Sequence, residues 1–329
     1  MVGGARTPVG GSWARSKISA APTLRALAIK AVLERTGVAA ADIDYVVMRQ
    51  VLTAGTGQIP ARRAATAAGL PMSVSAVNVN KVCLSRIDSI VMADMLIRAG
   101  IFHVVVAGGQ ESMTNAPHLL PKSRTGHKYG AAKLLDHLEW DDLWTASRPA
   151  HGSPDRSAQS STRPDLQARA DSFAVDSHTK AAARPRTVSS MTKLCRSPSP
   201  GKPDVRSDAG RRCAGRGQCR VAWRARPAFH HSGTVTAGSA SQLSDGACAV
   251  VVMNKAVAER RGLRWLAEIT GHGFVARPDS TLQSHPRKPS RPPARPRVSR
   301  RPHAPDGRGN GELSPATVDA MRKVCRARL

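Results

Sequence analysis

A chain of 329 residues, 41% of them hydrophobic, is long enough to bury two cores or one large one. Its formal net charge of +27 would ordinarily indicate a partner such as nucleic acid or an anionic membrane surface. No apolar run approaches the ~18 residues that a membrane span needs, and the first residues lack the apolar centre of a signal peptide, which argues against a membrane or secreted protein.

Up to about Trp144 the sequence alternates between helical and strand-like patterns, as α/β proteins do. The spacing of apolar residues predicts helices over 23–37, 60–69 and 85–99, and strands over 44–52, 76–82 and 102–107. Gly108 and Gly109 are expected to end the last of these strands. The predicted fold class is α/β, with a mixed sheet and layered helices.

After residue 145 regular patterns return only in pieces. The sequence predicts a helix near 164–183, a strand over 247–253, a short helix over 255–262, a strand over 266–274 and a terminal helix over 314–326. Between them, residues 184–226 carry 12 Lys and Arg against two acidic residues, and residues 285–329 carry 12 against three. The basic charge therefore belongs to segments rather than to the fold, and 184–226 and 285–313 are expected to be disordered.

Five stretches of this sequence resemble the motifs of one enzyme family, the thiolases, and stand in the same order. They are Gly4-Ala5-Arg6-Thr7-Pro8-Val9-Gly10, Gln50 to Arg62, Asn78-Val79-Asn80-Lys81-Val82-Cys83, Val104 to Pro117, and Gly233 to Ala247. The resemblance implies the N-terminal half of a thiolase-like fold. It also implies a thiolase-type acyltransferase of lipid metabolism, such as an acetyl-CoA acetyltransferase, which condenses acetyl-CoA or cleaves acetoacetyl-CoA through a cysteine thioester.

The resemblance assigns roles to two residues. Cys83 matches the cysteine that carries the acyl group, although its position alone would favour an inert buried cysteine. It lies between a predicted strand and helix, so the helix dipole is expected to lower the pKa of its thiol. Ser241 matches a position that touches the pantetheine arm of CoA, and its alternative is an ordinary turn serine. CoA and acetyl-CoA are substrates, and no cofactor is expected.

The sequence also departs from the family. Arg86 stands where thiolases have glycine, so a clash or an opening of the packing, and a guanidinium without a partner, are expected there. The asparagine, histidine and second cysteine motifs of the family's C-terminal half are absent from these 329 residues, and the Arg- and Pro-rich segments read like a frameshifted gene. The first alternative to an active enzyme is a truncated thiolase relic without turnover; a basic protein that binds nucleic acid non-specifically is the second.

We accordingly predict a division into four regions: 1–144 as the first part of the nucleophile domain, 145–226 as a degenerate loop region, 227–284 as the end of that domain, and 285–329 as a basic tail. The protein is expected in the cytoplasm, because six cysteines without a signal peptide fit a reducing compartment. Thiolases are homo-oligomers, but Arg86 and the lost half are expected to weaken assembly. No metal site is expected, because the spacing of Cys213, Cys219, His230 and His231 is wrong for zinc. No membrane and no specific nucleic acid is expected as a partner.

Overall fold

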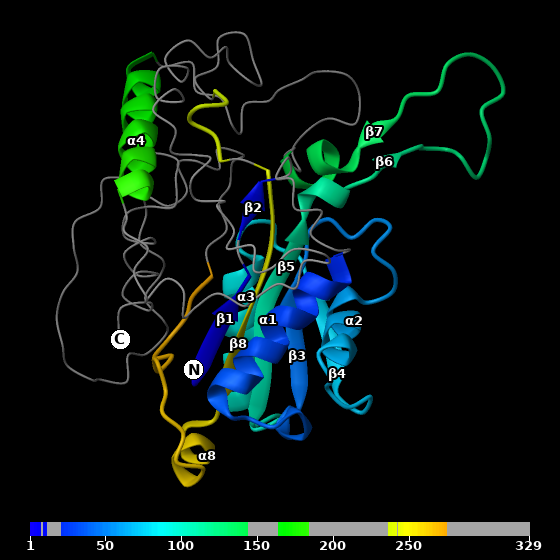
Figure 1. The fold of residues 1–329 in the computed structure, drawn as a ribbon. Helices are drawn as coiled ribbons and strands as arrows, with labels where there is room; N and C mark the ends of the chain where they lie inside the picture. The colour runs from blue at the N-terminus through cyan, green and yellow to red at the C-terminus, as the bar shows by residue number, and fades with distance from the viewer. Residues whose placement is uncertain (8, 12–20, 144–163, 184–235, 242, 275–329) are drawn as a thin grey trace, which may run out of the picture. The chain divides into compact units, whose positions relative to one another are not determined.

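The computed structural model describes residues 1–7, 9–11, 21–143, 164–183, 236–241 and 243–274 (Figure 1). The chain divides into two compact units. One unit includes residues 1–143 and 241–265 and contains the sheet. The other includes most of helix α4 (Pro164–Ala183) and residues 266–274. None of the helices in the described part of the chain is long and apolar enough to cross a membrane.

A mixed sheet forms the centre of the first unit. Its strands lie in the order β1 (Gly3–Arg6), β8 (Ser244–Met253), β5 (Val104–Ser112), β3 (Tyr45–Arg49) and β4 (Ser75–Val79), and β2 (Gly10–Gly11) pairs with β8. Strands β3, β4 and β5 are parallel, whereas β8 is antiparallel to both β5 and β1. The parallel strands are short and rich in valine, as expected for strands covered on both faces. The predicted α/β class and mixed sheet are confirmed.

Helices cover both faces of this sheet (Figure 1). Helices α1 (Ala21–Thr36) and α2 (Pro60–Ala67) pack against each other and against one face, where they enclose the main apolar cluster with Val46, Met48 and Val106. Helix α3 (Ser85–Arg98) packs on β5 and β3 from the other face. Because strand side chains alternate, Val47, Val105 and Gly109 face α3. Helix α8 (Lys255–Arg260) follows β8 directly.

Most of the predicted helices and strands of this unit are present within a few residues of their expected ends, but β5 is longer than predicted. Gly108 and Gly109 do not end the strand, which runs on to Ser112 and pairs with β8 along its whole length. A Cβ atom added to Gly108 would lie far inside contact distance of the carbonyl oxygen of Cys248 on β8. The glycine therefore permits a close approach of two strands rather than ending one of them.

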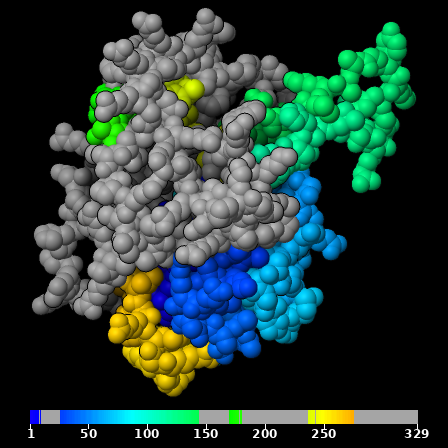
Figure 2. Space-filling model, in the orientation of Figure 1, coloured from blue at the N-terminus to red at the C-terminus, as the bar shows by residue number. Residues whose placement is uncertain are grey.

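Two further differences concern connections. An exposed arm follows β5 and is closed at its base by the short strands β6 (His118–Leu119) and β7 (Leu135–Asp136), and it stands out from the unit in Figure 2. The sequence did not predict it. Residues 266–274 form no strand, because they pair with no strand in the described part of the chain. Residues 184–226, 285–313 and 314–326 lie outside the described residues.

We predict that Gly108→Ala destabilises the protein by about 1–3 kcal/mol, because backbone atoms of β8 would have to move. Gly4→Ala is the matched control on another neighbour of β8, since its added Cβ would meet the movable Val250 side chain at 3.3 Å. Urea unfolding followed by circular dichroism measures both. Equal midpoints for the two variants would contradict the role assigned to Gly108.

Candidate active site

The carboxyl ends of the three parallel strands bring three of the recognised motifs together. Arg49 ends β3, Cys83 follows β4, and Glu111 lies near the end of β5. Parallel α/β sheets hold their ligands at this edge, because the loops that follow the strands meet there. The edge is therefore the candidate active site of the unit.

Cys83 lies in a tight turn between β4 and α3, as the sequence predicted. The backbone N–H of Leu84 donates to the Lys81 carbonyl at 3.2 Å and closes the turn. The fully buried Ser85 hydroxyl accepts a hydrogen bond from the Lys81 N–H and donates one to the Val82 carbonyl, each at 2.6 Å. The first residue of the helix thus fixes the turn that presents the thiol.

The residue before the cysteine has a strained backbone. Val82 has φ of 50°, in the left-handed region that β-branched residues rarely adopt. Its N–H is held by the Asn80 side-chain oxygen at 2.9 Å, and its carbonyl by Ser85. Strain of this kind persists only where surrounding contacts over-determine it. The turn is therefore a specified conformation, and Cys83 itself is exposed.

Glu111 joins β5 to β3 and to the loop after β3. Its buried carboxylate forms an ion pair with Arg49 Nη1 at 3.1 Å and accepts the N–H groups of Val51 and Leu52 at 3.0 and 3.3 Å. Burial raises the pKa of Glu111, while Arg49 and the two N–H groups lower it. The sequence placed both residues within recognised motifs but did not predict this pair.

A histidine beneath the same edge is held on both ring nitrogens. Nε2 of the buried His137 accepts the Ala54 N–H at 3.3 Å, so its proton lies on Nδ1, which faces the Asp141 carboxylate. Asp141 and Asp142 belong to a π-helical turn, Glu139–Leu143. Sequence reasoning assigned no role to His137. With both nitrogens engaged, His137 orders the loop and is not free to take a proton.

The expected lowering of the Cys83 pKa is wrong. Neighbouring protein partly desolvates the sulfur of this otherwise exposed residue, and this desolvation raises the pKa of the Cys83 thiol; Asp142 raises it further. Arg49 and a hydrogen bond from the Cys83 backbone act in the opposite direction. Removal from water and the carboxylate of Asp142 outweigh the stabilisation of the thiolate that the start of α3 was expected to provide.

Arg86 is accommodated without the clash that the sequence predicted. Its Cγ and Nε would be 2.7 and 2.9 Å from a Cβ added to Gly109, and the Cβ of Arg49 would be 3.1 Å away. The aliphatic part of Arg86 therefore occupies the space that a side chain at Gly109 would fill. The other expectation agrees with the structure: Arg86 Nε is buried and has no hydrogen-bond partner.

The second predicted site residue, Ser241, is exposed and lies shortly before β8. Its contact with CoA stays a prediction. The described residues contain no group of three or more potential metal ligands. Cys213, Cys219, His230 and His231 lie outside the described residues, so the structure does not test the prediction about zinc.

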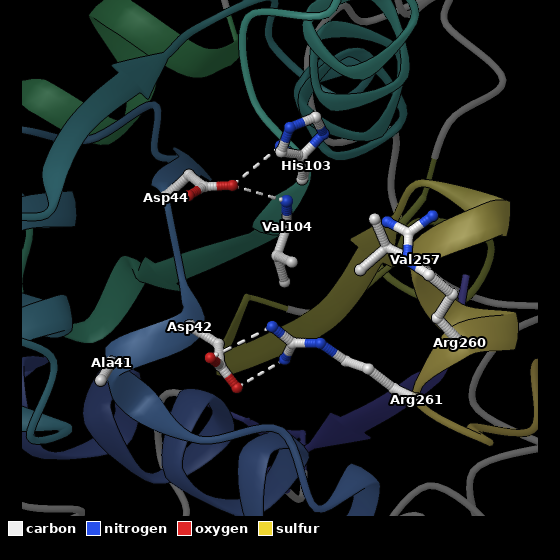
Figure 3. A pocket seen from close by; sticks show the side chains of 8 residues that line it. All are labelled: Ala41, Asp42, Asp44, His103, Val104, Val257, Arg260 and Arg261. Carbon is white, nitrogen blue, oxygen red and sulfur yellow. Dashed lines mark hydrogen bonds and ion pairs between the residues drawn. The ribbon is translucent and has the colours of Figure 1, made fainter.

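A surface hollow lies at the opposite ends of β3 and β5 (Figure 3). Asp44 accepts the N–H groups of His103 and Val104, each at 2.8 Å, and Asp42 pairs with both terminal nitrogens of Arg261 at 2.6 and 3.2 Å. Its carboxylates are thus engaged with neighbouring donors. These contacts join the start of two strands to the end of α8, and they account for the charges as structural ones.

Comparison with known proteins agrees with this edge as the functional one. A family model described as the thiolase N-terminal domain matches residues 1–256. A probable acetyl-CoA acetyltransferase of Mycolicibacterium smegmatis is 50% identical over 294 residues, which cover 87% of this chain and 74% of that protein. One from Mycobacterium tuberculosis is 48% identical over 87% of this chain and 73% of its own length, and the acetyl-CoA acetyltransferase of Cupriavidus necator is 41% identical over 83% and 70%.

We predict that Asp142→Asn lowers the pKa of the Cys83 thiol, because it removes one of the two causes that raise it. More thiolate then exists at any pH below that pKa, and thiolate is the species that iodoacetamide alkylates. Peptide mapping at neutral pH should show roughly two- to tenfold faster labelling of Cys83. Glu139→Gln removes the same charge from the same turn and serves as control. An unchanged pH profile in Asp142→Asn would exclude Asp142 as a cause.

Proposed function

The chain belongs to the thiolase family, as its motifs predicted, and on that premise we propose that Cys83 is the nucleophile of a thiolase-type acyl transfer from acetyl-CoA. The observation that carries the proposal is the position of Cys83. It is an exposed thiol on a strained turn, at the carboxyl edge of the parallel strands and at the start of α3. The relatives named as acetyl-CoA acetyltransferases support acetyl-CoA as the substrate.

The first half-reaction forms a thioester on the enzyme. The Cys83 thiolate attacks the carbonyl carbon of acetyl-CoA, a bond from Sγ to that carbon forms, and the bond to the CoA sulfur breaks. The proton lost by the Cys83 thiol ends on the CoA thiol. Ser85 and Asn80 hold the turn from which the sulfur attacks, and the positive charge of Arg49 favours the thiolate.

Removal of the thiol proton is the slow point of this scheme. The pKa of Cys83 is raised, so little thiolate exists at neutral pH. No side chain in the described part of the chain makes a hydrogen bond with Cys83, and both ring nitrogens of His137 are engaged. In the family, a histidine of the C-terminal half activates the nucleophile, and its motif is absent from these 329 residues. We therefore propose slow acylation and no efficient second half-reaction.

Ser241 as a contact of the CoA arm, a homo-oligomer, a location in the cytoplasm and a role in lipid metabolism belong to the same proposal. Each follows from membership of the family rather than from the geometry of the site. Ser241 is exposed, as a residue that meets a substrate arm must be.

The first test is covalent. Acetyl-CoA incubated with the protein should add one acetyl group to the peptide that contains Cys83, as seen by mass spectrometry. Cys83→Ser should abolish the adduct, and Cys248→Ser, which changes the other described cysteine, should leave it unchanged. Acetyl groups spread evenly over the cysteines would count against a nucleophile at Cys83.

The second test concerns turnover by a polypeptide of these 329 residues. We expect no measurable acetoacetyl-CoA thiolysis and no acetyl-CoA condensation. Loss of a single general base or oxyanion donor costs about 10²–10⁴ in rate, and several are absent from this sequence. The assay follows acetoacetyl-CoA by its ultraviolet absorbance. Steady turnover that disappears in Cys83→Ala would contradict the relic hypothesis and establish a working thiolase.

A further inference from the structure

One cation beside the candidate nucleophile has no counter-ion. Arg86 lies in the first turn of α3, three residues after Cys83, and residues at this spacing on a helix lie on the same side. It is half-buried, and neither a hydrogen bond nor an ion pair joins it to any residue that the structure describes. Removing a guanidinium from water without a partner is costly, so a charge in this state is ready to bind an anion.

The neighbouring charges do not neutralise Arg86. Arg49 lies beside it over Gly109, and the carboxylate of Glu111 is already paired with Arg49 and two backbone N–H groups. Asp142 interacts electrostatically with Arg49 and with Cys83. The carboxylates near the site are thus directed at Arg49. A surplus positive charge remains at Arg86, within one helical turn of the reactive sulfur.

We propose that Arg86 is a specificity-determining residue that binds the terminal carboxylate of an acyl chain carried by Cys83. The inference rests on the proposed function and narrows its substrate class to CoA thioesters of dicarboxylic acids. A guanidinium can hold a carboxylate by two parallel hydrogen bonds, which a lysine cannot reproduce. Arg86 thereby gives the site a reason to prefer a charged acyl chain to an acetyl or alkyl group.

The position of Arg86 favours the acyl chain over the phosphates of CoA as the source of the anion. Side chains three residues apart on a helix have Cβ atoms about 5–6 Å apart. A short diacid chain bonded to Sγ spans such a gap, whereas the pantetheine arm carries the CoA phosphates far beyond it. The chemical step is unchanged: the bond from Cys83 Sγ to C1 forms, the bond from C1 to the CoA sulfur breaks, and the thiol proton passes to free CoA.

The test compares glutaryl-CoA with pentanoyl-CoA, which has the same number of acyl carbons and no terminal charge. Single-turnover acylation of Cys83, followed by mass spectrometry, should be about 10- to 100-fold faster with glutaryl-CoA, as one charge-assisted contact predicts. Arg86→Ala and the size-matched Arg86→Gln should reduce this preference to about one or below. Arg63→Ala removes an exposed arginine of α2 and should retain the preference.

A binding measurement separates failure of this inference from failure of the proposed function. In Cys83→Ser, thermal unfolding at constant ionic strength should show stabilisation by glutaryl-CoA above that by pentanoyl-CoA, and Arg86→Gln in the same background should remove the difference. If that difference appears but wild type is never acylated, Arg86 binds the carboxylate and the proposed function fails. Equal acylation by both thioesters in wild type would overturn the inference alone. CoA by itself stabilising the protein through Arg86 would assign the site to a phosphate and also overturn it.

Discussion

The carboxylate of Glu111 satisfies three donors in a place that excludes most water. It holds Arg49 of β3 and the first two N–H groups of the loop that follows, so β5, β3 and that loop reach one edge in fixed positions. A buried arginine without this partner would be expensive, and a buried glutamate without these donors would be protonated. Arg49 in turn lies beside Arg86 and acts on Cys83. The electrostatics of the whole edge therefore depend on one buried acid.

The same edge shows that geometry and chemical activation are separate properties of a nucleophile site. The turn that carries Cys83 is tightly specified by Ser85, Asn80 and the left-handed conformation of Val82. The thiol in that turn is nevertheless held in its protonated form by desolvation and by Asp142. An acyl-transfer enzyme needs both a placed thiol and a group that takes its proton. The described part of the chain supplies the placement and leaves the activation to groups outside it.

The sequence predicted those parts of the fold that depend on local pattern. The bounds of α3 were correct to one residue, since Gly100, with φ of 73°, ends the apolar repeat, and the position of Cys83 followed from them. The continuation of β5 through Gly108 was missed, because the reason lies on β8, some 140 residues further along the chain. The effect of Asp142 on Cys83, the Glu111–Arg49 pair and the placement of Arg86 over Gly109 are likewise long-range. No motif records them, because motifs list residues and not the distances between them.

The exposed arm between β6 and β7 has a practical consequence for anyone who handles this protein. Lys122, Arg124, Lys128 and Lys133 are exposed there, and Tyr129 is fully so. Such a segment is where trypsin should cleave readily within the first unit. A cut there separates β5 from β8 along the chain but not in space, because the two strands remain hydrogen-bonded from Val104 to Ser112. A nicked preparation would run as fragments in a denaturing gel and still behave as one folded unit in its native state.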